Sequence, residues 1–587
     1  MSSASIKNFL RLKRLVADHR LLATILFLLM LLSAISESFG LVLVIPLISS
    51  LAGVSAEGVG GGAGKYIEII YDVLPANAQL EAVLLLLVLA FLAKTILQIM
   101  ARGLSTYVSL TLRESWSNQL LDHYFHANAA YLANNRQGEA AHNIGVEPFH
   151  ASKSIIVMID FGNRIILASA LFIVLLFGYW QATVVIGLTG LVVIGGMRRV
   201  TTEFSLRFGK KRLKIERQIT AIAIEAMAGV RQIKIFDLYH QWLDKLARRG
   251  RQYTKAQTTY DMVSDLPTHS TDLLMVIFLS AGLIILKRVL GADIESALVL
   301  LGFFVIVAYR LLIQINFIIS RRMKVAATLP SLMLMLDLIE DAPTREDLES
   351  GQSAAQLTGD IVFSGVGFSY GQGAAVFDGL NLTIPGRKTT AIVGTSGVGK
   401  STLADMLLGL QRPSSGTITI GGRDTTSLSL GSMRARIGYV SQDPDIFNVT
   451  VRANILMGLP DAEGDAVIEA ARLAHADQFI AALPDGYDTI VGDRGVKLSG
   501  GQRQRIAIAR TILRQPDLYI FDEASSALDS ESERNIRDSI SNLARNSTVV
   551  IIAHRLTTIE GADIIYRLRS GRAEPLSHAS LVSQDKQ

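Results

Sequence analysis

Long apolar segments dominate the first 340 residues and alternate with charged connections. A helix needs about 20 consecutive apolar residues to cross a lipid bilayer. The segments that meet this length begin near Leu21, Leu80, Ile165, Ala182, Leu273 and Ala297. The pattern therefore predicts a membrane half with six transmembrane helices. The short interval at residues 179–181 predicts a tight external hairpin between the third and the fourth.

Two connections inside this half, about residues 102–154 and 198–265, are unusually long. Both contain few glycines and prolines, which predicts membrane helices that continue below the bilayer and turn back through short helices. The segment 51–79 is different, because it begins with Gly and Ser and then places apolar residues beside Glu68 and Asp72. That pattern fits a short amphipathic helix on the outer membrane surface or an ordered loop.

Basic residues indicate which side of the membrane each connection occupies. Residues 198–255 contain fifteen Lys or Arg and five Asp or Glu, an excess typical of cytoplasmic connections. The N-terminal segment carries Lys7, Arg11, Lys13, Arg14 and Arg20. We therefore expect a multi-pass protein of the cell's inner (plasma) membrane, with its N-terminus in the cytoplasm. A cleavable signal is not expected, because the first apolar stretch continues past Ile35.

Composition supports this division and excludes several classes of protein. Half of the 587 residues are apolar and 19% are charged, a balance that fits a membrane half fused to a soluble half. The chain has no cysteine, which excludes disulfides, thiolate catalysis and Cys-ligated zinc. The net charge is +5, but the basic residues gather between apolar segments, so we expect no nucleic-acid partner.

The pattern changes after Arg322, where the apolar density falls. Residues 341–358 are polar and predict a linker. From residue 359 to 587, strand-like runs alternate with helical ones, which predicts an α/β domain with a largely parallel sheet. The expected strands are 361–363, 389–393, 437–440, 518–521 and 548–552. The predicted fold class is thus multi-domain: an α-helical membrane domain (1–340), the linker, and an α/β domain (359–587).

A glycine-rich loop, GTSGVGKS at residues 394–401, follows the strand 389–393 and precedes a helical run. A strand, a glycine loop and a helix N-terminus form the context of a phosphate-binding loop, whose backbone N–H groups surround the phosphates. Lys400 would add positive charge at the β- and γ-phosphates, and the Ser401 hydroxyl would bind Mg²⁺. The sequence therefore predicts ATP and Mg²⁺ as ligands of the C-terminal domain.

A pair of carboxylates, Asp522 and Glu523, ends the apolar strand 518–521. Such a strand delivers charge to the crevice where ligands bind in parallel sheets. Asp522 would hold Mg²⁺, directly or through water, and Glu523 would polarise the attacking water. The alternative is a pair of acids that only caps a buried strand.

With these motifs the chain resembles a half-transporter of the ATP-binding cassette (ABC) exporters over nearly its whole length. The signature of that family is LSGGQ, found here at residues 498–502. Tyr370 matches the aromatic residue that stacks on adenine, Gln442 the glutamine that senses Mg²⁺ and water, and His554 the histidine that contacts the γ-phosphate. SALD at 526–529 is similar to the loop that crosses the dimer interface. TIVGDRG at 489–495 is similar to the exporter-specific loop, but has Ile490 and Asp493 where the family has Glu.

The resemblance implies a set of site residues. The catalytic ones are Lys400, Gln442, Glu523 and His554, and those expected at Mg²⁺ are Ser401, Gln442 and Asp522. The nucleotide-binding residues are Tyr370, Gly394, Thr395, Ser396, Gly397, Val398, Gly399, Lys400, Ser401, Thr402, Gln442, Ser499, Gly500, Gly501, Gln502 and Asp522.

The signature also predicts a partner. Residues 499–501 form an N–H-rich turn at a helix start, which is a second anion site. One chain cannot place two phosphate sites on one nucleotide, whereas two chains arranged head-to-tail can. Every catalytic position is intact in this sequence, so a homodimer with two competent sites is expected rather than a heterodimer with a degenerate chain.

The membrane half indicates how ATP hydrolysis could be used. By resemblance, residues 123–139 correspond to the first of two coupling segments between the ATPase and the membrane helices, and residues 225–236 lie at or just after the second. Ionisable residues fall in or near spans, where they face a cavity or pair with each other: Glu37, Lys94, Asp160, Arg164 and Arg310. Asp160 and Arg164 fit a helical ion pair. For Glu37 the alternative is a buried polar contact, and for Lys94 and Arg310 it is a role without substrate contact.

The substrate is the least determined part. Residues 36–48 and 308–319 are similar to flippases of lipid-linked oligosaccharides and related lipid exporters. An exporter or flippase of an amphipathic, lipid-linked or anionic substrate is therefore expected, by alternating access. The competing hypotheses are a drug or small-peptide exporter with the same ATPase, and a soluble ABC ATPase acting on DNA or ribosomes, which the six apolar segments disfavour.

Overall fold

The computed structural model describes residues 19–44, 47, 79–128, 131, 137–178, 180–269, 273, 276, 280, 294–341, 348–354, 356–371, 373–523, 530–553, 559 and 561–576. Several expectations lie outside these residues: the basic segment before residue 19, the outer-surface segment 51–78, the turn at Tyr179, and most of the fifth membrane helix. The chain divides into two compact units, Met1–Arg345 and Glu346–Gln587.

The first unit consists of long helices. Their bounds are α2 Arg20–Val42, α5 Gln79–Phe125, α7 Gln137–Gly145, α8 Glu147–Gly178, α9 Trp180–Ala228, α10 Val230–Ile235, α11 Tyr239–His269 and α13 Ile294–Glu340. The helices α5, α9 and α13 have 47, 49 and 47 residues. At 1.5 Å per residue each is about 70 Å long, more than twice the roughly 30 Å of a bilayer core. They therefore extend well beyond an apolar layer, as the two long connections predicted.

Apolar stretches long enough to cross a membrane occur in three helices of the described part, α2, α5 and α8. The predicted fourth and last spans fall on α9 and α13, which are helical as expected. The helical nature of the membrane half is thus confirmed, while the count of six spans stays a prediction.

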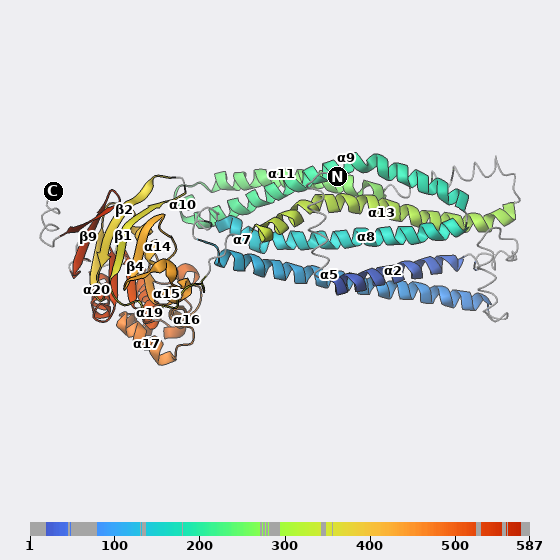
Figure 1. Cartoon of the computed structure of the whole chain (residues 1–587). Helices are drawn as coiled ribbons and strands as arrows, with labels where there is room; N and C mark the ends of the chain where they lie inside the picture. Colours follow the sequence, from blue (N-terminus) through green and yellow to red (C-terminus); the bar gives the residue numbers. More distant parts are fainter. Residues whose placement is uncertain are drawn as a thin grey trace. The chain divides into compact units, whose positions relative to one another are not determined.

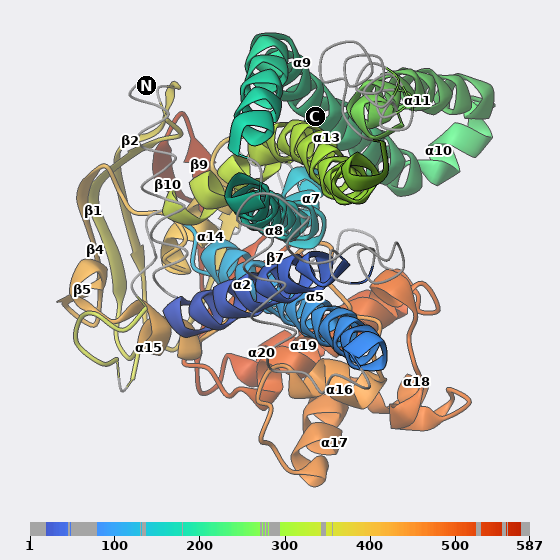
Figure 2. The same ribbon diagram turned by 90° about the vertical axis from the view of Figure 1, so that its right-hand side faces the viewer.

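Buried leucines hold the long helices together. α8 and α13 run side by side (Figure 1), and Leu171 and Leu175 of α8 are fully buried beside Val307 of α13. Figure 2 shows α2 beside α5, and α9 beside α11. A second apolar cluster joins α5, α8 and α13 through Trp116, Leu120, Ala151, Leu332 and Met335.

The second unit contains two sheets. The antiparallel sheet has the order β2-β1-β4-β5, and the other has the order β10-β9-β3-β8-β7-β6. The strands are β1 Ile361–Ser369, β2 Ala375–Ile384, β3 Thr389–Val393, β4 Ser415–Ile420, β5 Arg423–Asp424, β6 Ile437–Val440, β7 Leu518–Asp522, β8 Thr548–Ile552, β9 Ile564–Arg569 and β10 Arg572–Leu576. β9, β3, β8, β7 and β6 are parallel, and only the edge strand β10 is antiparallel. The predicted α/β fold is confirmed, and every expected strand is observed. Residues 361–363, however, belong to β1 of the antiparallel sheet and not to the parallel sheet.

Helices cover the parallel sheet, which explains why its strands are almost continuously apolar. All five residues of β8 are buried, as are the first four of β7. The helices of this unit are α14 Lys400–Leu407, α15 Leu430–Ala435, α16 Val451–Leu456, α17 Gly464–Leu473, α18 Asp477–Ala481, α19 Gly500–Leu513 and α20 Ser530–Leu543.

α9 and α13 approach each other closely at Gly209, which leads to one prediction about the stability of the protein. A Cβ at Gly209 would overlap the carbonyl oxygen of Ala327. Gly209→Ala should therefore separate the helices and lower the stability by about 1–3 kcal/mol, seen as a lower apparent Tm of the protein in detergent. Gly162→Ala on α8 is the matched control, because a Cβ there meets no atom within 4 Å. A Gly209→Ala protein as stable as the control would contradict the close approach.

Candidate functional site

Neighbouring strands deliver the described catalytic positions to one edge of the parallel sheet. β3, β8, β7 and β6 lie side by side in that order and run in the same direction. The glycine loop follows β3, Asp522 ends β7, and Gln442 follows β6. β8 leads into His554, which lies outside the described residues. The carboxyl edge of a parallel sheet is where ligands bind, and among the described residues this edge carries the glycine loop, Asp522 and Gln442.

The glycine loop needs its glycines for two reasons. Gly397 and Gly399 have φ values of +80° and +109°, which L side chains rarely adopt. A Cβ at Gly399 would also lie 2.8 Å from Val376 Cγ1, and one at Gly394 would lie 2.8 Å from the Leu568 carbonyl oxygen. The loop therefore turns tightly into α14, whose first N–H groups form an anion site.

Lys400 is held inside this loop. Its Nζ donates hydrogen bonds to the carbonyl oxygens of Gly394 at 2.9 Å and Thr395 at 3.1 Å. Burial lowers the pKa of Lys400, and the carboxylates of Glu523 and Asp522 oppose that shift. The ammonium group is thus positioned where a bound phosphate would be surrounded by loop N–H groups.

The carboxylate pair is fixed by contacts with adjacent strands. Tyr439 donates from its hydroxyl to Asp522 Oδ2 at 3.3 Å, and Gln442 Nε2 donates to Glu523 Oε2 at 2.8 Å. Burial and the charge of Asp522 raise the pKa of Asp405, an acid on α14. Asp522 therefore lies close to both the phosphate-loop helix and β6.

Glu523 has an unusual backbone. Its φ is +49°, a conformation that costs free energy in a residue other than glycine and is often found at functional sites. Its N–H donates to the carbonyl oxygen of Ile552 at 2.8 Å. That bond ties the end of β7 to β8 and directs the carboxylate toward Gln442.

Tyr370 lies beside the start of α14. Its hydroxyl is 3.1 Å from Thr402 Oγ1, and its ring packs edge-on against Phe368 with centroids 4.9 Å apart. The residue is 50% exposed. The geometry brings Tyr370 and the glycine loop together and leaves ring surface on which a base could stack.

The donors expected at a metal ion fit Mg²⁺ in their chemistry. They are a hydroxyl from Ser401, an amide oxygen from Gln442 and a carboxylate from Asp522, and Mg²⁺ prefers such oxygen ligands. Clusters of three or more His, Cys, Asp or Glu that could hold another kind of metal are absent from the described residues.

The signature residues form the N-terminus of α19. Ser499 Oγ accepts a hydrogen bond from Gln502 N at 3.2 Å, and Gln502 Oε1 accepts one from Ser499 N at 2.9 Å. This capping box satisfies two backbone donors. A Cβ at Gly500 would meet no atom within 4 Å, so the first turn opens onto free space, where its remaining N–H groups can receive an anion.

Two features of the site were not predicted from the sequence, a capping box and a contact between strands. The capping box is visible in the sequence as a serine followed three residues later by glutamine. The Tyr439–Asp522 contact joins two strands about eighty residues apart in the chain, and only the strand order reveals it.

The exporter-specific loop carries exposed apolar residues. Ile490 is 54% exposed, and Val496, next to the loop, is 76% exposed. Asp493 accepts a hydrogen bond from Asn448 Nδ2 at 2.8 Å, and Arg494 has a φ of +50°. The acid at 493 thus ties the loop to the segment that precedes α16.

The coupling segments are partly described. α5 ends at Phe125, which is 75% exposed, and Asn134 lies outside the described residues. Residues 225–236 contain the short helix α10 and the exposed residues Met227, Val230, Ile235 and Phe236.

Ionisable residues in the membrane half form two groups. Glu37 of α2 is buried, with Lys94 Nζ of α5 at 2.9 Å and Arg310 Nη1 of α13 at 4.0 Å. Asp160 pairs with Arg164 four residues on, as predicted, at 3.7 Å. Arg321 of α13 also pairs with Asp160. Each group therefore links different helices.

Comparisons with known proteins agree with this geometry. The family model described as "ABC transporter" matches residues 377–526, and the one described as "ABC transporter transmembrane region" matches residues 22–307. The fold is similar to a bacterial Atm1-family ABC exporter with ATP bound, with a TM-score of 0.74 and 26% identity over 93% of this chain and 96% of that one.

Two relatives align over most of their length. The ATP-dependent lipid A-core flippase of Legionella pneumophila is 33% identical over 82% of this chain and 81% of its own. The heterocyst differentiation ATP-binding protein HepA of Nostoc is 33% identical over 79% and 76%. In the uncharacterized ABC transporter ATP-binding protein y4gM of Sinorhizobium fredii, 43% identical, the match spans only 45% of each chain. The chain belongs to the ABC transporter family and has the half-transporter architecture of its exporters, one membrane domain followed by one ATP-binding domain.

Proposed function

We propose that two copies of this chain form an ATP-hydrolysing exporter or flippase in the inner membrane, with the ATP-binding domain in the cytoplasm. Its substrate is an amphipathic molecule with a lipid-linked or anionic head group. The observation that carries this proposal is the similarity to a lipid A-core flippase over about four-fifths of both chains. The alternative is a drug or small-peptide exporter, and measurements of ATPase stimulation by lipids and by hydrophobic cations distinguish the two.

In the proposed ATP site, the glycine loop binds the phosphates and Lys400 neutralises them. Ser401, Gln442 and Asp522 hold Mg²⁺. Glu523 polarises the attacking water, and its hydrogen bond with Gln442 at 2.8 Å orients the carboxylate. His554 completes the site at the end of β8 and contacts the γ-phosphate.

The homodimer follows from the two anion sites of one chain. The loop at α14 and the first turn of α19 both present N–H groups to phosphate. In a head-to-tail pair, each ATP is bound by the loop of one copy and by the signature of the other. ATP then stabilises the closed dimer, because it binds that state better, and hydrolysis releases it.

The substrate's head group would be recognised in the membrane half. Glu37, Lys94 and Arg310 together carry one net positive charge, and the Arg310 side chain is 41% exposed while Lys94 is 14% exposed. Both cations contact Glu37, but Arg310 is farther from it and more exposed than Lys94, so Arg310 is the one proposed to bind an anionic group. Two copies would present two such arginines to one substrate.

Glu523→Gln should lower ATP turnover by about 100-fold or more, since general-base catalysis contributes 10²–10⁴-fold, while ATP binding persists. The measurement is phosphate release together with nucleotide binding. Glu463→Gln, an exposed acid of the same domain, should keep the wild-type rate. Wild-type turnover in Glu523→Gln would remove the role assigned to this carboxylate.

Mixed dimers test whether the site is shared. Lys400→Met disables the glycine loop, and Ser499→Asp keeps a good helix cap but repels phosphate. A dimer with one change in each copy should retain one intact site and about half of the wild-type ATPase activity. A dimer with both changes in one copy should have none. The opposite pattern would mean that each site lies within one chain.

Arg310→Ala should raise the concentration of anionic lipid needed for half-maximal ATPase stimulation about tenfold or more, because a charge-assisted hydrogen bond contributes about 1.5–3 kcal/mol. The assay uses nanodiscs with lipid A or a polyprenyl-diphosphate glycan, and Arg310→Lys and Arg207→Ala are the controls. The drug-exporter alternative would be favoured by a different result: hydrophobic cations stimulate ATPase activity, and neither Arg310→Ala nor Lys94→Ala changes the stimulation by the lipids.

A further inference from the structure

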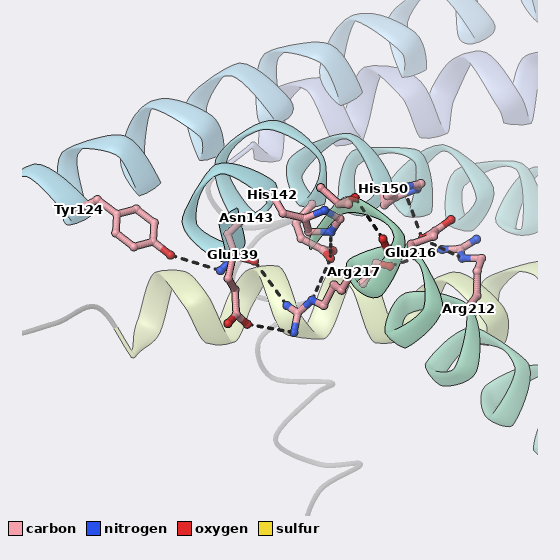
Figure 3. A network of polar contacts seen from close by, with 11 residues as sticks. Tyr124, Glu139, His142, Asn143, His150, Arg212, Glu216 and Arg217 are labelled. Atoms are coloured by element: carbon pink, nitrogen blue, oxygen red, sulfur yellow. Dashed lines mark hydrogen bonds and ion pairs between the residues drawn. The ribbon is translucent and has the colours of Figure 1, made fainter. Parts of the chain in front are cut away.

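A connected group of polar side chains lies where α7, α8 and α9 meet, outside the nucleotide site (Figure 3). We name it the α7–α9 cluster. Its members are Tyr124, Glu139, His142, Asn143, Glu147, His150, Arg212, Glu216 and Arg217. The charged members come from three helices, and no role has been assigned to them above.

Glu147 is the centre of the first half of the cluster. Its side chain is 0% exposed, and His142 Nε2, itself 3% exposed, lies 3.1 Å from Glu147 Oε1. Arg217 Nε of α9 lies 3.7 Å from the same oxygen. Figure 3 shows Arg217 also directed toward Glu139. A carboxylate at the start of α8 thus lies between an imidazole from α7 and a guanidinium from α9.

The chain of contacts continues to α5. Arg217 Nη2 donates to Asn143 Oδ1 at 3.5 Å, and Asn143 Nδ2 donates to the Tyr124 hydroxyl at 3.2 Å. Tyr124 stands one residue before the end of α5. The first half of the cluster therefore connects four helices.

Glu216 is the centre of the second half. It lies 3.7 Å from His150 Nε2 of α8 and 3.7 Å from Arg212 Nε, one turn earlier on α9. Arg212 Nη2 also donates to Ser331 Oγ of α13 at 3.5 Å. Consecutive turns of α9 are thus tied to α8 and α13.

The position of the cluster along the chain suggests what it does. Tyr124 and Glu139 both lie within the first coupling segment, residues 123–139. Residues 225–236, at or just after the second, begin eight residues after Arg217, roughly 12 Å along α9 at 1.5 Å per residue. The cluster therefore joins the helices that lead from both coupling segments to the membrane.

Stability alone is a weak explanation for such a group. Taking charges out of water costs free energy, and apolar residues of similar volume often stabilise a contact as well or better. Charges from different helices do fix relative position, because their attraction is lost when one helix slides or rotates. The cluster is thus suited to hold α8 and α9 in register while they move.

We propose that Glu147 and Arg217 are positioning residues that couple the movement of the cytoplasmic helix ends to the outer ends of the membrane helices. Without their contact, α9 would move on ATP binding while α8 would not follow. ATP hydrolysis would continue, but the change in the membrane half would be lost.

The absence of cysteine from the 587 residues allows a direct test with spin labels. Ile173→Cys reports on α8, 26 residues from Glu147, which is roughly 40 Å, and Ile468→Cys reports on α17; these positions are 51% and 41% exposed. Double electron–electron resonance then measures the distance between the two Ile173 labels, and separately between the two Ile468 labels, of a dimer with and without ATP and vanadate. If the wild type shows no distance between labels on two copies, the homodimer proposal fails. A single chain that carries both Ile173→Cys and Tyr107→Cys then supplies a distance within that chain, which reports on α8 instead.

In Glu147→Gln, the distance between the two Ile468 labels should still change when ATP and vanadate are added. ATPase activity should stay within about twofold of the wild type. The change in the distance between the two Ile173 labels should fall below about half of its wild-type value. Arg217→Met should behave in the same way, and Arg217→Lys should keep most of the response. Glu203→Gln is the matched control, since Glu203 forms an exposed pair with Arg207 on the same helix.

Two results would overturn the inference. One is a wild-type Ile173 response in both Glu147→Gln and Arg217→Met. The other is an equal loss of the Ile468 response, the Ile173 response and ATPase activity, which would mean that the cluster only supports folding. If Glu147→Gln does not fold, Arg217→Met, whose side chain is already 31% exposed in the wild type, decides between these outcomes.

Discussion

The side-by-side order of β3, β8, β7 and β6 is the constraint on which the nucleotide site depends. Because these strands are parallel and adjacent, residues far apart in the sequence meet at one edge, where α14 also presents its N-terminus. Apolar strands buried on both faces keep that edge rigid. The hydrogen bond between Gln442 and Glu523 exists only because β6 and β7 are neighbours. The chemistry of the site is thus a consequence of strand order.

In the first unit, the corresponding constraint is the placement of charge between helices. Glu37 and Glu147 are both almost fully buried, and each is paired with a basic side chain of another helix, Lys94 and Arg217 respectively. Such groups are costly to desolvate and lose their partners when the helices shift. Leucine clusters supply the adhesion between helices, whereas the charges specify which register those helices adopt. A transporter needs both, because its helices must move without losing their order.

Local motifs explain why much of the site could be predicted. The glycine loop, the Asp522–Glu523 pair and the strands that carry them are defined within a few residues of sequence, and their fold is the observed one. The coupling of Lys94 to Glu37 and of Arg217 to Glu147 could not be predicted, since it depends on how helices distant in sequence pack. Asp160 with Arg164 was predictable because a helix brings residues four apart together, but the added contact with Arg321 was not. His554 and residues 526–529 stay predictions.

The central claim is that each nucleotide is bound between two copies of the chain. Cryo-electron microscopy of the Glu523→Gln variant with ATP tests it most directly, because this variant should bind ATP without hydrolysing it and so remain in the closed dimer. The account predicts each ATP between Lys400 of one copy and Ser499 of the other. An image in which Lys400 and Ser499 of the same copy meet around one nucleotide would contradict it.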